Sequence, residues 1–320
     1  MALQIILIFK VRLNTLIDNK TSKAFRGVAI IMVMIVHFAN WNYQGPLSEI
    51  WKGMVSSFGI YGVDIFFMLS GYGLVKSYEK NGIDRRFVTR RILNSYVPYL
   101  LIIGSLSIFV DKNIDGPMAV LDLLIGQDFW FMRVLFAFYL MFMVIYRIGF
   151  LKEILLTVAV LALTCYLYLT SHADFWYLSN GAFLIGVYAA TIEKKYGDKV
   201  KEFMVRFNLA GIGLAAAFSS AYLYSVTASK SAHMLSSMMF TIMILGFCVQ
   251  LDCKGYILPV IGSYSLYIYL IHGRILWFLV SKFETMSFHL IALHDFWISV
   301  LAGIMIGLAI EKVIGMVQKK

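Results

Sequence analysis

The sequence predicts an all-α membrane protein, a polytopic bundle of about ten transmembrane helices. Of its 320 residues, 60% are hydrophobic and only 14% are charged, and the mean hydropathy is +0.78. A soluble domain carries roughly 25% charged residues. Apolar runs long enough to cross a hydrocarbon core of about 30 Å recur along the whole chain. We therefore expect one integral membrane domain over residues 1–320, with no appended soluble domain.

Charged or turn-rich gaps separate the apolar runs and define the predicted spans. The spans lie near 24–41, 58–78, 92–110, 130–148, 153–170, 175–192, 207–226, 234–251, 257–280 and 296–315.

The distribution of basic residues predicts the topology. Of the 28 Lys and Arg, 22 fall in the termini and alternate gaps on one side, and only four fall in the gaps on the other side. Cytoplasmic loops are rich in Lys and Arg. The pattern predicts an even number of spans, both termini in the cytoplasm, and a multi-pass protein of the inner or plasma membrane. It also accounts for the net charge of +10 without nucleic acid as a partner.

Neither cysteines nor histidines form a recognisable ligand pattern. Cys165 and Cys248 lie within predicted spans, and the sequence holds no Cys-x-x-Cys pair. The six histidines include no His-x-x-x-His spacing. We expect neither a disulfide framework nor a metal site.

The first span carries two ionisable residues in an otherwise apolar helix. Arg26 and His37 are eleven residues apart, with nothing between them more polar than Gly27. At 1.5 Å per residue, the two lie about 16 Å apart along the axis, roughly half of the hydrocarbon core. One cation then lies near the cytoplasmic face and one imidazole toward the outer face. Ionisable groups inside a span indicate function by default.

Asp64 enters the second span from its outer end and lies near the depth of His37. A His–Asp pair is the obvious arrangement, because the carboxylate fixes the imidazole tautomer and stabilises its cation. Such a pair suits a general base. The alternative is a hydrogen bond that only holds the first two helices together.

Four further side chains lie at the same outer level. Arg133 either pairs with Asp64, binds an acceptor or developing oxyanion, or extends to the outer headgroups. Trp130 alone is typical of an aromatic belt. His272 and Arg274 lie in the outer half of the ninth span, where a second imidazole favours a polar cavity.

The loop after the second span concentrates four arginines in seven residues, Arg85, Arg86, Arg90 and Arg91. Arginine recognises phosphate through its planar, often bidentate fork. This loop therefore suits a phosphorylated cofactor, although any cytoplasmic loop collects arginine for topology alone.

Together these segments resemble the acyltransferase-3 family, integral membrane transacylases that modify cell-surface glycans. The similar segments are Arg26-Gly27 followed by His37, Gly62 to Gly71, the basic run from Phe87 to Tyr99, Trp130-Phe131, the helix-6 stretch NGAFLIGVYAA, and Tyr269 to His272. One position departs from the pattern. The family usually carries Arg-x-x-Arg after the second helix, and here Asn94 stands where the second arginine is expected after Arg91.

The resemblance implies an acyl-CoA donor, most often acetyl-CoA, that approaches from the cytoplasm. Its nucleotide end is expected against Arg90 and Arg91, with Arg26 anchoring or steering it from below. The thin pantetheine arm carries the thioester toward His37.

On the acceptor side, the resemblance implies an envelope polysaccharide or its lipid-linked precursor beside the lipid bilayer. His37 is the expected general base, with Asp64 orienting it and Arg133 stabilising the oxyanion. Trp130 and His272 are expected to bind substrate.

Two other classes of protein fit part of the pattern. A transporter or flippase also has buried ions and a central cavity, but the chain lacks a clear internal repeat and paired Gly/Pro-broken helices. A structural scaffold explains the loop charges and leaves Arg26, His37, Asp64 and His272 without a role.

Overall fold

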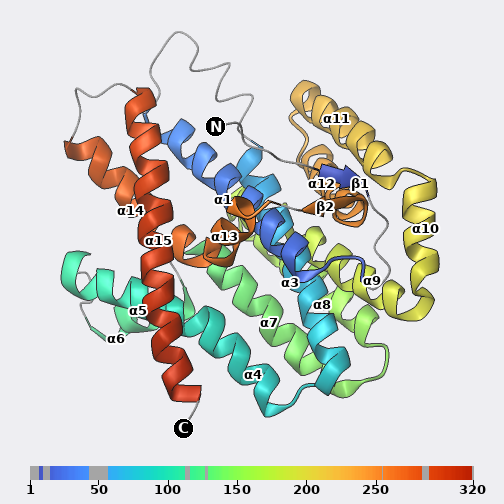
Figure 1. The fold of residues 1–320 in the computed structure, drawn as a ribbon, viewed down its shortest axis with the longest axis horizontal. Helices are drawn as coiled ribbons and strands as arrows, with labels where there is room; N and C mark the ends of the chain where they lie inside the picture. Colours follow the sequence, from blue (N-terminus) through green and yellow to red (C-terminus); the bar gives the residue numbers. More distant parts are fainter. Residues whose placement is uncertain are drawn as a thin grey trace.

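The computed structural model describes residues 7–9, 15–42, 57–111, 116–126, 129–253, 255–282 and 288–318. It is a helical bundle, which confirms the all-α prediction (Figure 1). The elements are β1 (Leu7–Phe9), α1 (Asn19–Asn42), α3 (Phe58–Asn81), α4 (Arg85–Arg91), η1 (Ile92–Tyr96), α5 (Val97–Leu106), η2 (Ser107–Asp111), α6 (Pro117–Ile125), α7 (Trp130–Ile148), α8 (Lys152–Leu169), η3 (Asp174–Trp176), α9 (Asn180–Tyr196), α10 (Asp198–Arg206), α11 (Leu209–Thr227), α12 (Lys230–Gln250), β2 (Leu251–Cys253), α13 (Ile257–Ser263), α14 (Ser265–Lys282) and α15 (Phe288–Gln318).

Within these ranges, nine helical segments are long and apolar enough to cross a membrane, and they match nine of the ten predicted spans. The remaining predicted span, near 257–280, is also helical and corresponds to α13 and α14. Helix α14 carries His272, Arg274 and Lys282 and is not among the nine. The chain is a multi-pass membrane protein.

Helix α3 lies at the centre of the bundle and packs against α1, α9 and α12. Its contact with α9 is close because small residues face each other. A Cβ at Gly71 would meet the carbonyl oxygen of Phe183, and a Cβ at Gly186 would meet that of Met68. Small residues of this kind let helix backbones approach in a membrane.

A second close crossing joins α1 to α13. A Cβ at Gly27 would meet the carbonyl oxygen of Leu258, and a Cβ at Gly262 would meet that of Lys23. Helix α14 follows α13 directly and also contacts α1. This crossing therefore places the polar helix α14 beside the helix that carries Arg26 and His37.

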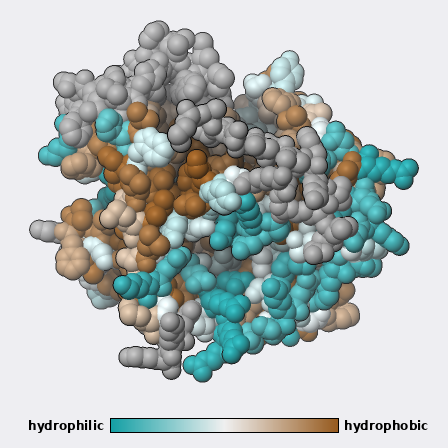
Figure 2. Space-filling view, in the orientation of Figure 1, coloured by the Kyte–Doolittle hydropathy of each residue, from teal (hydrophilic) through white to brown (hydrophobic). Residues whose placement is uncertain are grey.

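The turn between α3 and α4 places the arginine-rich helix. Helix α3 ends at Gly82, whose φ of +66° suits a residue without a side chain. Asp84 then caps α4 by accepting a hydrogen bond from the backbone N–H of Phe87 at 2.6 Å. Hydrophilic residues gather on the side of the molecule where α4 and α10 lie (Figure 2).

Other surfaces of the bundle are apolar, as expected of helices that face lipid. Large hydrophobic side chains are exposed on α7, α8, α11 and α15, including Leu140, Val158, Phe218, Met305 and Leu308. Extended apolar exposure of this kind marks an interaction surface, here the bilayer.

Two features were not predicted from the sequence. The strands β1 and β2 pair antiparallel, with Ile8 opposite Asp252. The carboxylate of Glu193, only 7% exposed, accepts hydrogen bonds from the Tyr72 hydroxyl at 2.6 Å and from the backbone N–H of Leu16 at 2.8 Å. This buried carboxylate ties α9 and α3 to the segment that leads into α1.

Candidate active site

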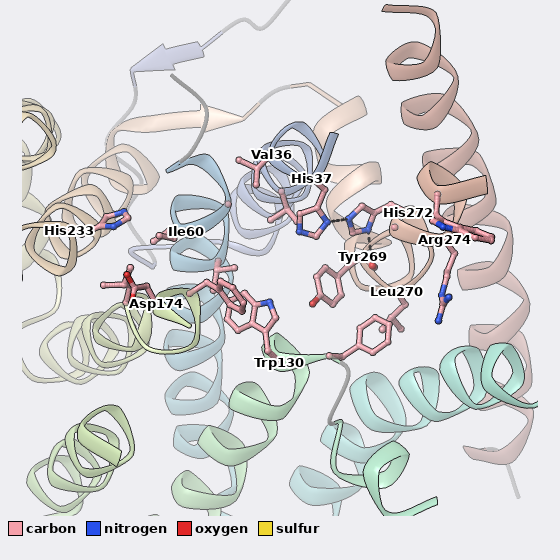
Figure 3. A pocket seen from close by; sticks show the side chains of 18 of the residues that line it. Val36, His37, Ile60, Trp130, Asp174, His233, Tyr269, Leu270, His272 and Arg274 are labelled. Atoms are coloured by element: carbon pink, nitrogen blue, oxygen red, sulfur yellow. Dashed lines mark hydrogen bonds between the residues drawn. The ribbon is translucent and has the colours of Figure 1, made fainter. Parts of the chain in front are cut away.

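The centre of the candidate site is a pair of imidazoles from α1 and α14. Nδ1 of His37 lies 2.8 Å from Nε2 of His272, and the two ring centroids are 4.9 Å apart. His272 is 2% exposed, and its ring is held inside the bundle (Figure 3).

The partners of His272 decide which nitrogens carry protons in the neutral pair. Its Nδ1 lies 2.8 Å from the carbonyl oxygen of Tyr269 and 3.2 Å from that of Ile268. Because a carbonyl oxygen only accepts, Nδ1 of His272 carries the hydrogen and Nε2 holds the lone pair. That lone pair accepts a hydrogen bond from a protonated Nδ1 of His37. The lone pair of His37 is therefore on Nε2, the atom left to take a proton from a substrate.

His37 and His272 line a cavity of about 730 Å³, which we call the His37 cavity. Its walls come from α1, α3, α7, η3, α11, α12 and α14, and include Trp130, Asp174, His233 and Arg274. Figure 3 shows the second ring nitrogen of His37 facing this cavity, toward Trp130. The volume is within the usual range of about 300–1,000 Å³ for small-molecule sites. His272, the imidazole expected on the ninth predicted span, lines this cavity, but apart from a few polar side chains the lining is mostly apolar.

A second cavity of about 430 Å³, which we call the Arg26 cavity, lies on the other side of Tyr269. Tyr269 is the one described residue that lines both cavities. Its ring packs against Phe131 at 5.0 Å and Phe129 at 6.3 Å between centroids, so aromatic rings form the wall between the cavities at this point. The polar lining of the Arg26 cavity includes Arg26, Ser70, Asn94, Ser95, Tyr139 and Glu311. Arg26 and His37 of α1 therefore line two different cavities.

Residues 20–312 match the model of the acyltransferase-3 family, an acyltransferase domain. The chain belongs to this family. It is a membrane acyltransferase, and the resemblance found in the sequence is confirmed. No curated protein and no solved structure shows a significant match to the chain.

The structure does not pair Asp64 of this acyltransferase with His37, so that prediction is wrong. Asp64 is fully buried on α3, and its Oδ1 accepts a hydrogen bond from the Ser237 hydroxyl at 2.7 Å. Ser237 belongs to α12, on a different side of α3 from α14. The rotation of α3 about its axis directs the Asp64 carboxylate toward α12. The imidazole of His272 occupies the place at His37 expected for the carboxylate.

Arg133 and Trp130 both begin α7 but have different surroundings. Trp130 lines the His37 cavity. The guanidinium of Arg133 lies over the ring of Trp176, 5.8 Å from its centroid, and Arg133 is not among the described residues that line either cavity. The structure therefore brings Trp130, but not Arg133, to the His37 cavity. We call the His37–His272 pair the dyad.

The arginines of α4 lie outside the Arg26 cavity. Arg90 is exposed, and the guanidinium of Arg91 lies over the ring of Phe87, 4.5 Å from its centroid. Asn94 lines the cavity instead, from the π-helical turn η1. Turns of this type are frequent at functional sites. Asn94, which stands where the family pattern has a second arginine, thus lines the Arg26 cavity in this chain.

Sequence reasoning missed Asp174 and His233, which line the His37 cavity from η3 and α12. Each is a lone polar residue near a predicted loop, without a motif around it, so no sequence signal separated the two from ordinary loop residues. In the described part of the chain, no group of three or more His, Cys, Asp or Glu side chains is arranged to hold a metal ion.

Proposed function

We propose that this acyltransferase transfers an acyl group, in the first instance acetyl, from cytoplasmic acyl-CoA to a hydroxyl of a cell-envelope glycan or its lipid-linked precursor. One observation carries the proposal. The His37 cavity and the Arg26 cavity meet at Tyr269, directly beside the His37–His272 pair. A donor in one cavity and an acceptor in the other come together at that wall.

The basic residues assign the donor to the Arg26 cavity. Asn94 and Ser95 of this cavity lie in η1, directly after α4, and α4 holds four arginines on the side that the loop charges predict to be cytoplasmic. The phosphates of CoA pair with these arginines, Arg90 and Arg91 among them. Arg26 then guides the thinner part of the donor. The predicted orientation suits an inner or plasma membrane, where acyl-CoA is available on one side only.

The transfer step follows from the tautomer of His37. The acceptor oxygen attacks the thioester carbonyl carbon and forms the new C–O bond while its proton moves to Nε2 of His37. The C–S bond breaks, and the proton then passes to the thiolate of CoA. His272 accepts the Nδ1–H of the imidazolium and stabilises it during the step. General base catalysis contributes about 10²–10⁴-fold, and positioning of the two substrates contributes more.

The test compares envelope glycans by mass spectrometry in cells that carry the wild-type chain, no chain, His37→Ala or His172→Ala at matched expression. His172 is a suitable control because its imidazole bonds to Thr170 on a loop and is not among the described residues that line the His37 cavity. We expect an acetyl-sized mass increment with wild type and His172→Ala only. The same increment with His37→Ala would overturn the role of the base, and identical glycans in all four strains would overturn the acceptor class.

A further inference from the structure

The end of the His37 cavity remote from the dyad carries two polar residues that the transfer step does not use. Asp174 begins η3, and His233 lies in the first turn of α12. Figure 3 shows both at one end of the cavity and the His37–His272 pair at the other, with Trp130 between them. Both Asp174 and His233 line the cavity.

His233 has an unsatisfied buried nitrogen. The residue is 7% exposed, and its ring stacks on Tyr224 with centroids 4.1 Å apart. Its Nε2 is buried and has no hydrogen-bond partner in the part of the chain that the structure describes. Buried polar atoms are nearly always hydrogen-bonded, and one that is not destabilises the fold. A ligand in the cavity is a suitable partner for this atom.

Asp174 is held in place by groups that use only one of its oxygens. The Tyr177 hydroxyl donates to Oδ1 at 2.6 Å, and Nζ of Lys230 lies 2.9 Å from the same oxygen. Nζ of Lys230 also donates to the Tyr177 oxygen at 3.3 Å, which closes a three-membered network. These contacts orient the carboxylate, and Oδ2, which takes part in none of them, is the oxygen that we assign to a hydroxyl of the ligand.

Aromatic side chains separate this polar pair from the dyad. Trp130 packs on Phe175 with ring centroids 5.1 Å apart, and both line the cavity. Aromatic rings offer an apolar face, and the nearby carboxylate and imidazole offer an acceptor and a second hydrogen-bonding atom. A molecule with several hydroxyls on an otherwise apolar ring matches this combination, since each hydroxyl both donates and accepts.

We propose that Asp174 and His233 form an acceptor subsite that binds hydroxyls of a sugar ring lying against Trp130 and Phe175, while another hydroxyl of the acceptor reaches His37. The inference rests on the proposed function and specifies how its acceptor is held. The donor cannot be the occupant at this end, because its thioester arrives at Tyr269, beside the dyad. Because the polar pair and the dyad lie at opposite ends of the cavity, we expect the acceptor to be a molecule that extends from one to the other.

The test measures transfer from labelled acetyl-CoA by the purified full chain. The acceptor is the glycan extracted from cells that lack the chain, with its concentration expressed as hexose. Asp174→Asn removes the charge and keeps the shape, whereas His233→Phe keeps the ring and removes both nitrogens. His233→Gln restores a hydrogen-bonding group, and His172→Phe is the matched control outside the cavity. Size-exclusion profiles establish that each variant is folded.

We expect Asp174→Asn and His233→Phe to raise the KM for the glycan at least tenfold, with partial recovery in His233→Gln. The KM for acetyl-CoA and the acceptor-independent hydrolysis of the thioester are expected to stay at wild-type values in all four variants. An unchanged glycan KM, or an equal rise in the KM for acetyl-CoA, would overturn the subsite and leave the proposed function standing. If wild type moves no label to the glycan, the proposed function fails, and the sugar subsite fails with it.

Discussion

The carbonyl oxygen of Tyr269 lies 2.8 Å from Nδ1 of His272. The residue that lines both cavities therefore also accepts the hydrogen bond that orients the His272 imidazole. The side chain of Tyr269 forms the wall, and its backbone sets the tautomer. In the proposed mechanism, one turn of α14 thereby couples the path of the donor to the protonation state of His37. A change in the Tyr269 side chain leaves its carbonyl in place, which allows the two roles to be tested separately.

Shortening the Tyr269 side chain is expected to join the cavities. In Tyr269→Ala, water and the thioester meet without an acceptor, because the ring that packs on Phe131 is gone. We expect acceptor-independent hydrolysis of acetyl-CoA to rise by roughly tenfold, since closed sites exclude such side reactions. Tyr269→Phe keeps the wall and should hydrolyse at the wild-type rate. Equal hydrolysis in both variants and wild type would show that Tyr269 is not the barrier.

Removal of the His272 imidazole is expected to impair His37 as a base without preventing substrate binding. In His272→Ala, Nδ1 of His37 loses its acceptor, and the lone pair is no longer confined to Nε2. We expect kcat to fall by about 10²–10⁴-fold, the range of general base catalysis. His272→Gln offers an amide oxygen and should recover part of the rate. Steady-state kinetics over a range of pH provide the measurement, and the profile of His272→Ala should differ in shape from wild type, because the proton acceptor at Nδ1 of His37 is lost. A purely structural role would lower activity without altering that profile.

Arg26 is expected to affect the donor more than the acceptor. Hydrogen bonds to charged groups contribute about 1.5–3 kcal/mol, so Arg26→Ala should raise the KM for acetyl-CoA by roughly 10- to 100-fold. Arg206→Ala is the control, because Arg206 is exposed on α10 and is not among the described residues lining a cavity. If the KM for the glycan rises instead, Arg26 serves the acceptor side.

Asp64→Asn distinguishes the arrangement in the structure from the His37–Asp64 pair predicted from the sequence. The asparagine Oδ1 can still accept from Ser237, and the His37–His272 bond is not touched. We therefore expect the rate of acyl transfer to fall less than about tenfold, compared with about 10²–10⁴-fold for His37→Ala. Equal losses in the two variants would restore Asp64 to the chemistry.

The α3–α9 crossing provides a stability prediction with an internal control. Gly186→Ala places a methyl group against the carbonyl oxygen of Met68, and overpacking of this kind costs about 1–3 kcal/mol. Gly73→Ala, on α3, has nothing within 4 Å of its new methyl group and should be neutral or stabilising by about 0.5–1 kcal/mol. The thermal unfolding midpoints in detergent are the measurement. A similar midpoint for both variants would contradict the close crossing.

The sequence by itself determined the positions of the nine helical segments that, in the described part of the chain, are long and apolar enough to cross a membrane, because hydropathy acts over whole segments. It also determined that Arg26 and His37 lie at different depths, since the helical rise depends only on their spacing. The Arg26 cavity and the His37 cavity bear out this separation.

Only the tertiary structure decided which side chains meet. Depth places Asp64, His272 and His37 at one level, but the rotation of each helix about its axis selects the partner. The glycine crossing of α1 with α13 brings α14 to His37, while α3 directs Asp64 to Ser237. Asp174 and His233 reach the cavity from elements far apart in the chain. Such convergence depends on how side chains interlock between helices, and that packing is a property of pairs of surfaces rather than of any one segment.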